Sequence, residues 1–515
     1  MPFAKMPARH SPIYYCLGNK EPKVVFMTKE TNASSIIDRR GIYYQAFGLY
    51  GGIAGFYDYG PVGLRIRRNI ETQWRSLFVN ELGSLEIETT NLMPEAVFRA
   101  SGHLSTFTDP VINCATCNSS YRADKLLEAF YESKGMDKEV ATVKKLSKKE
   151  METEITENRI RCERCGGSLA KVEDFNLMFK THVAHKGGEA IYLRPETAQG
   201  IFVDFKSLFR LYGMKLPAII CQVGKVYRNE ISPRQQLVRL REIIQMETEV
   251  FFDPEAEETS LGEIETGKIL SSEIAFAESG SETAKTRSLA DLLELSMIPN
   301  RHFAVLLYLE KRLMERLGMP SGAYRFRQIE KEELPHYSRG NVDLEVKTSY
   351  GYIEVAGNAY RTDYDLSQHA KVSGNETSVV SGERKLVPHV VEASIGADRL
   401  LFSLLDNSVE EGKDRGWEWL RLNERLAPYL YSVFPLQKDD KLIEKAKEIH
   451  RILSEKGVPS YYSDSGSIGK RYARSDEIGV PYAITCDYDT LGDNSVTVRN
   501  RDDTQQTRKL ISEIL

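Results

Sequence analysis

The pattern of hydrophobic and polar positions is most regular near the middle of the chain. Residues 219–226 and residues 243–252 are mostly apolar, each run is long enough for one buried strand, and the second carries Glu247 and Glu249 on one face. Two apolar runs joined by a polar segment predict an antiparallel strand pair whose turn carries fixed positive charge. The charged positions of that segment are Arg228, Glu230, Arg234, Arg239, Arg241 and Glu242.

Apolar residues recur at helical spacing in three further segments, which predicts amphipathic helices packed on a core. One begins near residue 63, ends at Gly83 and is followed by a short strand that leads to Pro94. The other two cover residues 303–317 and residues 442–453, and a glycine closely follows each. The apolar face of the first helix is formed by Ile70, Trp74, Leu77 and Phe78.

Several weaker patterns complete the division of the chain. Residues 1–26 have no periodicity and predict a loosely attached extension, and residues 251–300 lose periodicity and suggest an insertion between strands. Residues 388–404 predict a strand, a glycine turn and a helix. From about residue 424 the pattern changes, with strands at 481–486 and 496–498 and a final helix over 504–515. Alternating short elements of this kind predict a small α/β domain with a mixed sheet.

Two Cys-x-x-Cys pairs lie at Cys114/Cys117 and Cys162/Cys165, and two glycines follow the second pair. Each such turn points two thiolates at one centre, so two turns together predict a structural tetrahedral zinc site. The spacing between the pairs is wider than in ordinary zinc ribbons, and paired buried thiols without metal are the alternative. The segment between the pairs is helical in pattern and rich in lysine.

Composition narrows the class of protein without identifying a partner. A chain of 515 residues should hold two or three domains, and 41 % hydrophobic content is ordinary for a globular protein. No apolar run approaches the roughly 20 residues needed to span a bilayer, and no signal-peptide pattern opens the chain, so we expect a cytoplasmic protein. A net charge of −5 neither indicates nor excludes nucleic-acid binding, because phosphate contacts depend on a local basic face.

Ordered motifs in the charged hairpin resemble motif 2 of the class II aminoacyl-tRNA synthetases. They are Tyr-Arg-Asn-Glu at 227–230, Arg-Leu-Arg-Glu at 239–242 and Gln-Met-Glu at 245–247. The resemblance covers roughly residues 35–515 and is closest to the glycyl-tRNA synthetases of the dimeric type. Further motifs that carry it are YDYGP at 57–61, EAVFRASGH at 95–103, RPETAQG at 194–200 and EASIGADR at 392–399. A P-loop of the GxxxxGK[ST] kind is absent, which argues against a Walker-type ATPase.

The resemblance implies an α+β fold with an antiparallel-sheet catalytic domain over residues 34–423, preceded by an extension over residues 1–33. It further implies a zinc-ribbon-like insertion over 111–166, a second insertion over 251–300, and an α/β anticodon-binding domain over 424–515. The helix, strand and proline over residues 63–94 would be motif 1, which builds the dimer interface in class II enzymes, so a homodimer is expected. An ordinary amphipathic helix on a core fits the same pattern.

The implied activity is glycine–tRNA ligation, in which glycine and ATP form glycyl-adenylate and the glycyl group passes to the 3′ end of tRNA(Gly). The alternative is a non-catalytic paralogue that serves as a nucleic-acid-binding accessory subunit. Such proteins keep the fold but lose the arginines of motifs 2 and 3, and both Arg228 and Arg399 are present here. A synthetase for another amino acid is disfavoured by RPETAQG together with EASIG.

The resemblance also implies roles for individual residues. The catalytic residues would be Arg228 on the α-phosphate and glycine carboxylate, Arg399 on the γ-phosphate, and Glu230, while Glu354 would hold ATP-bound Mg²⁺. Glycine would be bound by Arg99, Glu196, Glu247, Glu392, Ser394 and Gly396. The ATP site would comprise Arg228, Asn229, Glu230, Val238, Arg239, Arg241, Glu242, Ile243, Glu354, Val355, Gly396 and Arg399.

Without the resemblance, simpler interpretations hold for most of these positions. The charged hairpin would be a solvated turn with nearly neutral ion pairs, Arg99 a surface charge, and RPETAQG an ordinary helix start. Family members often have phenylalanine, which stacks on adenine, where Ile243 stands, and proline where Ala393 stands. Secondary candidates near the metal, each expected to be solvated when taken alone, are Asp343, Glu345, Arg361 and Asp365.

Residues 467–474 resemble the anticodon-binding domain shared by several class II synthetases. Lys470, Arg471 and Arg474, with Tyr472 between them, would suit phosphate contacts and base stacking in a single-stranded loop. A basic helix start on a solvated face is the alternative that the residues alone favour.

Overall fold

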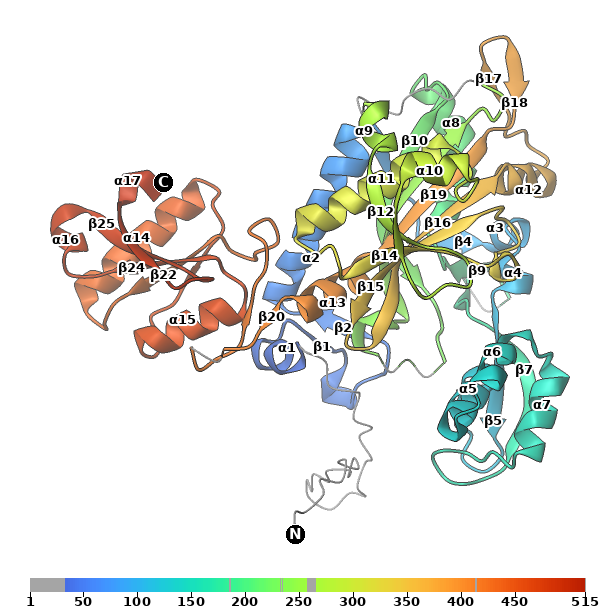
Figure 1. Ribbon diagram of the computed structural model, residues 1–515, viewed down its shortest axis with the longest axis horizontal. Coiled ribbons are helices and arrows are strands. Elements are labelled where there is room, and N and C mark those ends of the chain that lie inside the picture. Colours follow the sequence, from blue (N-terminus) through green and yellow to red (C-terminus); the bar gives the residue numbers. More distant parts are fainter. Residues whose placement is uncertain are drawn as a thin grey trace.

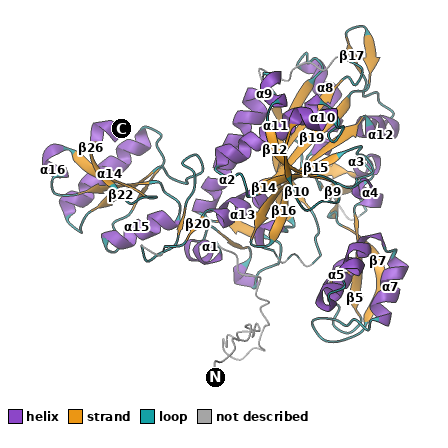
Figure 2. Ribbon diagram, viewed as in Figure 1, coloured by secondary structure: helices purple, strands orange, loops and turns teal. Residues whose placement is uncertain are grey.

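A nine-stranded sheet forms the centre of the largest part of the molecule in this computed structural model (Figures 1 and 2). The structure describes residues 33–184, 187–231, 233, 235–256, 265–412 and 415–514. Neighbouring strands are antiparallel except in the β10–β3 and β12–β14 pairs. In spatial order the strands are β13 (Lys285–Ser288), β12 (Glu273–Ala277), β14 (Tyr324–Gln328), β15 (Asn341–Thr348), β16 (Gly351–Thr362), β19 (His389–Gly396), β11 (Glu242–Phe252), β10 (Ala218–Tyr227) and β3 (Leu85–Ile87).

The alternation of side chains along β11 assigns each face of the sheet its role. Met246, Val250 and Phe252 join the large core that also contains α2 (Pro61–Trp74), α11 (Arg301–Leu317) and α13 (Ala397–Asn407). Because successive side chains of a strand point to opposite faces, Glu247 and Glu249 lie on the other face. That face is covered by α8 (Ala198–Leu211), α12 (Tyr364–Ser373) and α3 (Glu95–Ala100). The mixed helix and antiparallel-sheet class expected from the sequence is confirmed.

The charged hairpin predicted from the two apolar runs is confirmed, since β10 and β11 pair antiparallel with Tyr227 opposite Glu242. The predicted helix beyond residue 63 is also confirmed: α2 continues as a π-helical segment, Arg75–Glu81, before Gly83 takes a positive φ of 66°. The helix predicted over residues 303–317 is α11, and it ends at Gly318 with a φ of 77°. A left-handed residue suits glycine because it has no Cβ.

The segment 251–300 was expected as an insertion, yet it builds two strands of the central sheet. Strand β12 pairs with β14, and β13 forms the outer edge, followed by α10 (Leu289–Glu294). These strands are short and β13 is largely exposed, so their sequences show little of the alternation that marks a half-buried strand.

A separate lobe carries the two Cys-x-x-Cys turns (Figure 1). Its three-stranded antiparallel sheet consists of β6 (Ser120–Arg122), β5 (Thr108–Cys114) and β7 (Leu169–Asn176). Helices α5 (Ala123–Lys134), α6 (Asp137–Thr142) and α7 (Lys148–Glu157) fill the segment between the cysteine pairs, as its pattern predicted. The lobe has its own hydrophobic core, which includes Cys114 and Cys162.

The C-terminal domain is a mixed five-stranded sheet, as predicted, with the order β23-β22-β24-β25-β26. The final helix predicted over residues 504–515 is wrong for most of its length, because residues Gln506–Leu510 form the edge strand β26 and only Ile511–Ile514 is helical (α17). All five side chains of β26 are exposed, so backbone pairing with β25 defines this strand and no alternation announces it. The other elements are β22 (Tyr431–Pro435), α14 (Asp440–Glu455), β23 (Ser460–Tyr462), α15 (Ile468–Glu477), β24 (Tyr482–Cys486), α16 (Thr490–Asp493) and β25 (Ser495–Asn500).

The C-terminal domain contacts the first described helix of the chain through ion pairs. Arg39 and Arg40 of α1 (Ser34–Arg40) both pair with Glu477 at the end of α15.

Among the described residues no helix is long and apolar enough to cross a membrane. The predicted extension falls, except for Ala33, outside the described residues, as does Arg234. The remaining small elements are β1 (Tyr43–Gln45), β2 (Tyr57–Tyr59), β4 (Leu92–Pro94), α4 (His103–Thr106), β8 (Lys180–His182), β9 (Ala190–Leu193), α9 (Thr266–Leu270), β17 (Val379–Ser381), β18 (Arg384–Leu386), β20 (Val409–Glu410) and β21 (Trp419–Leu420).

Candidate active site

A cavity of about 640 Å³ lies on the acidic face of the central sheet. Strands β11 and β19 lie beneath it, and their register places Glu247 opposite Ser394 and Glu249 opposite Glu392. Ser394 in turn faces Gly357 on β16. Ten residues predicted from the sequence line the cavity: Glu196, Arg228, Ile243, Glu247, Glu354, Val355, Glu392, Ser394, Gly396 and Arg399.

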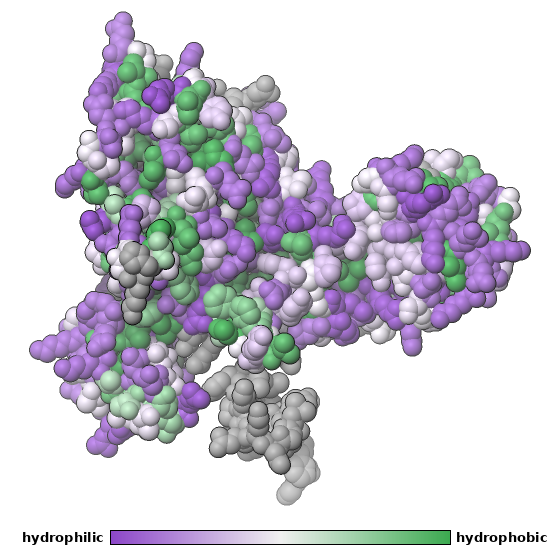
Figure 3. Space-filling view, turned by 180° about the vertical axis from the view of Figure 1, so that it is seen from behind, coloured by the Kyte–Doolittle hydropathy of each residue, from purple (hydrophilic) through white to green (hydrophobic). Residues whose placement is uncertain are grey.

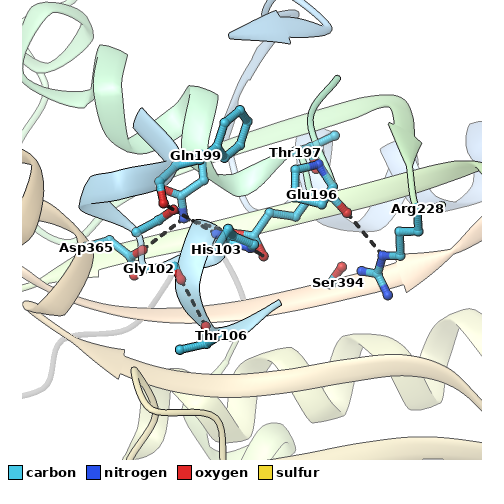
Figure 4. Close-up of polar contacts among 12 residues, drawn as sticks. Gly102, His103, Thr106, Glu196, Thr197, Gln199, Arg228, Asp365 and Ser394 are labelled. Carbon is cyan, nitrogen blue, oxygen red and sulfur yellow. Dashed lines mark hydrogen bonds and ion pairs between the residues drawn. The ribbon is translucent and has the colours of Figure 1, made fainter. Parts of the chain in front are cut away.

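Arg228 follows the end of β10 and reaches into this cavity (Figure 4). Its Nε donates to the carbonyl oxygen of Pro195 at 3.2 Å, and its guanidinium lies 5.6 Å from the centre of the Phe107 ring. These contacts use one edge of the guanidinium and hold it in place. The group therefore offers a fixed positive charge at one end of the cavity, which suits a phosphate or carboxylate.

Arg399 lies on the first turn of α13 and bridges two other elements. Its Nε donates to the carbonyl oxygen of Val238 at 3.0 Å, and its Nη1 donates to the carbonyl oxygen of Glu354 at 3.0 Å. The Glu354 carboxylate lies 3.3 Å from the same nitrogen and remains half exposed to solvent. The guanidinium and a solvent-accessible carboxylate thus meet where a nucleotide with its metal could bind.

Asp343 lies near Glu354 in the cavity wall, on β15. Burial and the negative charge of Glu354 raise the pKa of Asp343 to about 8, against the attraction of Arg327. Two carboxyl groups that repel each other in this way are suited to share a divalent cation, which prefers oxygen ligands. The donor set therefore fits Mg²⁺.

The inner end of the cavity is organised by Arg361, whose side chain is only 1 % exposed. It donates to Asp365 at 2.7 Å and to Glu392 at 2.7 Å, and it approaches Glu196 at 3.5 Å. The ring of Tyr337 lies 3.9 Å from its guanidinium carbon. One buried cation thus orients three carboxylates, and its charge offsets part of their mutual repulsion.

A second set of contacts, from Gln199 and His103, also fixes Glu196 (Figure 4). Gln199 donates to Glu196 at 2.7 Å and to Asp365 at 2.9 Å, and its own carbonyl oxygen contacts His369 Nε2 at 2.8 Å. His103 Nε2 lies 3.6 Å from the Glu196 carboxylate. Burial alone would raise the pKa of Glu196, but the charges of His103 and Arg361 outweigh it and hold that pKa far below its usual range.

The other two carboxyls of the floor titrate near neutral pH. Burial raises the pKa of Glu247 to about 7 even though Thr197 donates a hydrogen bond to it at 2.6 Å. Burial likewise raises the pKa of Glu392 to about 8, in spite of Arg361. An added cation such as an ammonium group would favour the ionised form of both groups, so the floor is a site prepared for positive charge.

Comparison with known proteins agrees with this geometry. The chain is 36 % identical to the glycine–tRNA ligase of Methanothermobacter thermautotrophicus over 93 % of this chain and 97 % of that protein. It is 37 % identical to the glycine–tRNA ligase of Pyrococcus horikoshii over 93 % of this chain and 96 % of that protein. The chain belongs to the glycine–tRNA ligase family. Residues 431–515 also match the model of an anticodon binding domain.

Several residues predicted for this family's site lie outside the cavity. Arg99 pairs with Glu95 one helical turn away, and its side chain is 62 % exposed. Its exposed position on the short helix α3 keeps it away from this cavity. Six predicted ATP-site residues form the adjoining loop without lining the cavity, namely Asn229, Glu230, Val238, Arg239, Arg241 and Glu242.

The loop residues are engaged mainly with one another. Glu230 pairs with Arg239 at 2.8 Å, and its carbonyl oxygen accepts two hydrogen bonds from Arg241. The Nη1 atom of Arg241 donates to the carbonyl oxygen of Ala54. Glu242 pairs across the hairpin with Lys225 at 2.5 Å. In this structure these residues shape the loop, and of the arginines that the structure describes, Arg228 and Arg399 line the cavity.

Sequence reasoning underrated the buried charges of the site. Asp343, Glu345, Arg361 and Asp365 were each expected to be solvated, and that prediction is wrong, because each is largely buried against an opposite charge. The four-residue spacing of Arg361 and Asp365 is a signal that could have paired them. His103 and Gln245 lie in quoted motifs and also line the cavity, although no role was predicted for either. Cavity residues outside the quoted motifs include Phe107, His336, Tyr337 and Asn341.

The four cysteines of the separate lobe come together as the paired turns predicted. One sulfur from each lies within 4.8 Å of the others, with Cys114 and Cys165 3.5 Å apart and Cys117 and Cys162 3.6 Å apart. Thiolates on a tetrahedral zinc ion lie about 3.8 Å apart, given Zn–S bonds of about 2.3 Å. The donor set and its spacing therefore fit zinc.

The predicted anticodon contacts divide into two groups. Arg471 is buried at 2 % exposure and donates to the carbonyl oxygens of Pro435 and Leu436, while Tyr472 donates to or accepts from Thr485 at 2.7 Å. Both side chains therefore serve the packing of the domain. Lys470 is exposed, and Arg474 is partly exposed with one contact to the Ser465 carbonyl oxygen, so these two remain accessible to RNA.

Proposed function

We propose that this protein activates glycine with ATP and transfers the glycyl group to the 3′ end of tRNA(Gly). The observation that carries the proposal is one cavity lined both by buried carboxylates and by two anchored arginines. A small zwitterion fits between these charges, with its ammonium on the floor and its carboxylate toward Arg228. Membership of the glycine–tRNA ligase family supports the same conclusion.

The first step requires no nucleophile from the protein. A carboxylate oxygen of glycine attacks the α-phosphorus of ATP in line, the bond to the bridging oxygen breaks, and pyrophosphate leaves with the electron pair. Arg228 holds the α-phosphate and the incoming carboxylate, and Arg399 stabilises the pyrophosphate end. Fixed cations placed where negative charge develops lower the barrier without reorganisation. In the second step a ribose hydroxyl of the tRNA 3′ end attacks the glycyl carbonyl and AMP leaves.

We assign the ATP-bound Mg²⁺ to Glu354 and Asp343, whose carboxyls face the cavity next to Arg399. When bound, Mg²⁺ neutralises phosphate charge and orients the leaving pyrophosphate. Ile243 lines the cavity where family members often stack phenylalanine on adenine, so the base of ATP would rest on an aliphatic side chain.

Glycine would be selected by size and by its backbone charges alone. Glu196, Glu247 and Glu392 receive the ammonium group, and Ser394 stands beside them on the floor. A methyl group on the α-carbon would have to displace packed atoms here, which typically costs about 1–3 kcal/mol. Alanine is therefore rejected by exclusion rather than by a missing contact.

The accessory parts complete the proposal. Zinc bound by Cys114, Cys117, Cys162 and Cys165 would be structural, because four protein ligands leave it no open position. The C-terminal domain would bind the tRNA anticodon with Lys470 and Arg474, and the protein would act as a homodimer.

The decisive experiment is amino-acid-dependent exchange of pyrophosphate into ATP, measured with each of the standard amino acids. We expect exchange with glycine and at most a small fraction of that rate with alanine. If the purified protein binds tRNA but shows no glycine-dependent exchange, it is the non-catalytic accessory paralogue instead.

A further inference from the structure

One more carboxyl group lies beneath the floor of the amino-acid pocket, next to two of the carboxyls that the proposed ammonium site uses. Glu249 lies on β11 two residues beyond Glu247 and directly opposite Glu392 of β19. One carboxyl oxygen from each of these three residues lies within 4.8 Å of the other two. Since all three side chains are buried, water screens them little, and like charges this close cannot all remain ionised.

The hydrogen bonds of the neighbouring carboxyls show which group is left over. Glu392 accepts from Arg361 at 2.7 Å, and Glu247 accepts from Thr197 at 2.6 Å. Both oxygens of Glu249 are buried and have no hydrogen-bond partner among the described residues. An ionised carboxylate in that position would lose its hydration without compensation, which is among the costliest arrangements in a protein interior.

A protonated carboxyl resolves this problem because it carries one O–H donor and no charge. The nearby acceptors for that donor are the oxygens of Glu392 and Glu247. We propose that Glu249 holds a proton in the resting site and acts as a positioning residue for Glu392, to which it donates this hydrogen bond. Glu249 does not line the cavity, so it acts on glycine through Glu392 and not by contact.

This role deepens the proposed function and rests on glycine binding at this floor. With Arg361 on one side and the Glu249 hydroxyl on the other, Glu392 is held by two donors and still has lone pairs free for an ammonium group. The neutral state of Glu249 also limits the negative charge of the floor to what one ammonium and Arg361 can balance.

Most of the surroundings of Glu249 favour its protonated form. Burial raises its pKa most, followed by the charges of Glu392 on β19 and Glu247 on its own strand, while Arg361 on β16 opposes them and Asp365 on α12 adds to them. The neighbour on β10 is Ile220, which cannot ionise.

Two variants of Glu249 separate the proton donor from the charge. Glu249→Gln keeps the shape and an N–H donor, and we expect its kcat/KM for glycine in pyrophosphate exchange to stay within about threefold of the wild type. Glu249→Leu keeps much of the volume but has no donor, and we expect its KM for glycine to rise about tenfold or more, since a hydrogen bond to a charged group is lost. The KM for ATP should be unchanged in both.

Glu310→Gln is the matched control for the loss of a buried carboxyl. Glu310 is fully buried on α11, against the opposite face of the sheet, and burial raises its pKa to about 8. This variant should keep the wild-type KM for glycine. A rise equal to that of Glu249→Leu would show that the effect is not specific to the amino-acid floor and would overturn the proposal.

A second measurement does not depend on activity. If Glu249 is protonated when folded, it ionises on unfolding above its ordinary pKa of about 4.3, so folding becomes less favourable as pH rises toward the folded pKa. Glutamine does not titrate, and we therefore expect Glu249→Gln to gain stability relative to the wild type between pH 5 and pH 8. A variant that instead loses stability over this range would mean that native Glu249 is ionised, and the proposal would be wrong.

The outcomes distinguish this inference from the proposed function. A wild-type protein without glycine-dependent exchange contradicts the function, while the stability measurement still reports the protonation of Glu249. An active wild type in which Glu249→Gln raises the KM for glycine as much as Glu249→Leu does contradicts the inference alone, because the carboxylate charge would then be what binds.

Discussion

At the scale of single residues, the site depends on a few charges whose positions are fixed by other groups. Arg228 and Arg399 each donate a hydrogen bond from Nε to a backbone carbonyl oxygen, which orients the guanidinium before any substrate binds. Arg361 is fully buried and orients the carboxylates of Asp365 and Glu392 by donating hydrogen bonds to them. Such preorganised groups cost little further ordering when the transition state forms.

Replacing Arg228 by glutamine tests the preorganised charge most directly. Glutamine keeps much of the side-chain length and some hydrogen-bonding ability but removes the charge. Loss of one such charged group typically lowers the rate on the order of 10²–10³-fold. We expect glycine-dependent pyrophosphate exchange to fall by this factor in Arg228→Gln, with tRNA binding nearly unchanged, because the anticodon domain is separate.

Arg99→Gln is the matched control for this experiment. Arg99 makes only an exposed contact with Glu95, worth at most about 1 kcal/mol, so exchange should stay close to wild type. Exchange that survives in Arg228→Gln, or that is lost in Arg99→Gln, would contradict the placement of these two arginines.

At the scale of elements, the lobe with the cysteines is a compact unit whose sheet and helices surround the two turns. Two of its four cysteines belong to its hydrophobic core, so a metal at this position would join the strand β5 to the segment that enters β7. Structural zinc of this kind contributes directly to folding.

We expect purified protein to contain about one zinc per chain and Cys162→Ser to lower that content. The measurement is elemental analysis together with titration of free thiols. Cys486→Ala is the control, because Cys486 is buried in the C-terminal domain away from the lobe, and its zinc content should equal that of the wild type. Metal-free protein with all four thiols open to titration would refute the zinc site.

Helix α15 offers a second test at this scale, since neighbouring basic residues on it have different roles. Arg471 is buried and donates to two carbonyl oxygens at the end of β22 and just beyond it. Loss of charged hydrogen bonds in a buried position typically costs about 1.5–3 kcal/mol each, so Arg471→Ala should destabilise the C-terminal domain by about 3 kcal/mol.

Lys470→Ala serves as the comparison, because this residue is exposed and surface changes usually stay within about 0.5 kcal/mol. Thermal or denaturant unfolding of the two variants measures the difference in their stability. Charging of tRNA should be weakened in Lys470→Ala without loss of stability. Equal stability in both variants would show that the Arg471 contacts contribute nothing.

At the scale of the whole molecule, exposed apolar side chains gather on the catalytic part. In the view from behind, green patches are more extensive there than on the C-terminal domain (Figure 3). Leu211 and Tyr212 at the end of α8 are 70 % and 64 % exposed, and Tyr212 shares a surface cleft with Leu85 of the edge strand β3. This cleft adjoins the region that resembles motif 1, so we propose that a homodimer would form here, with the same patch on both chains.

We therefore expect a sedimentation mass near twice the 58.5 kDa of one chain at micromolar concentration. Charged replacements at the patch, Leu211→Glu with Tyr212→Glu, should shift the protein toward monomer. Leu491→Glu changes an exposed leucine of the C-terminal domain and should leave the mass unchanged. A wild-type mass equal to one chain would refute the dimer.

The strongly periodic elements and the ordered motifs could be predicted from the amino-acid sequence. The hairpin of β10 and β11, the helices α2 and α11, and the turn from β19 into α13 were predictable, because a buried face imposes its period on the residues. The motifs around Arg228, Glu196 and Arg399 likewise pointed to residues that one cavity brings together.

Which charges are buried, and what each one contacts, depends on how distant segments pack together. Arg361 also contacts Glu196 and Glu392, which lie on segments far from it in the chain, and no local pattern records such neighbours. The same holds for Arg99 and Arg471, whose motifs match the family but whose side chains point respectively to solvent and into the domain interior. Strand β26 was missed for a related reason: an exposed edge strand is held by backbone hydrogen bonds, and these bonds leave no signature in the side chains.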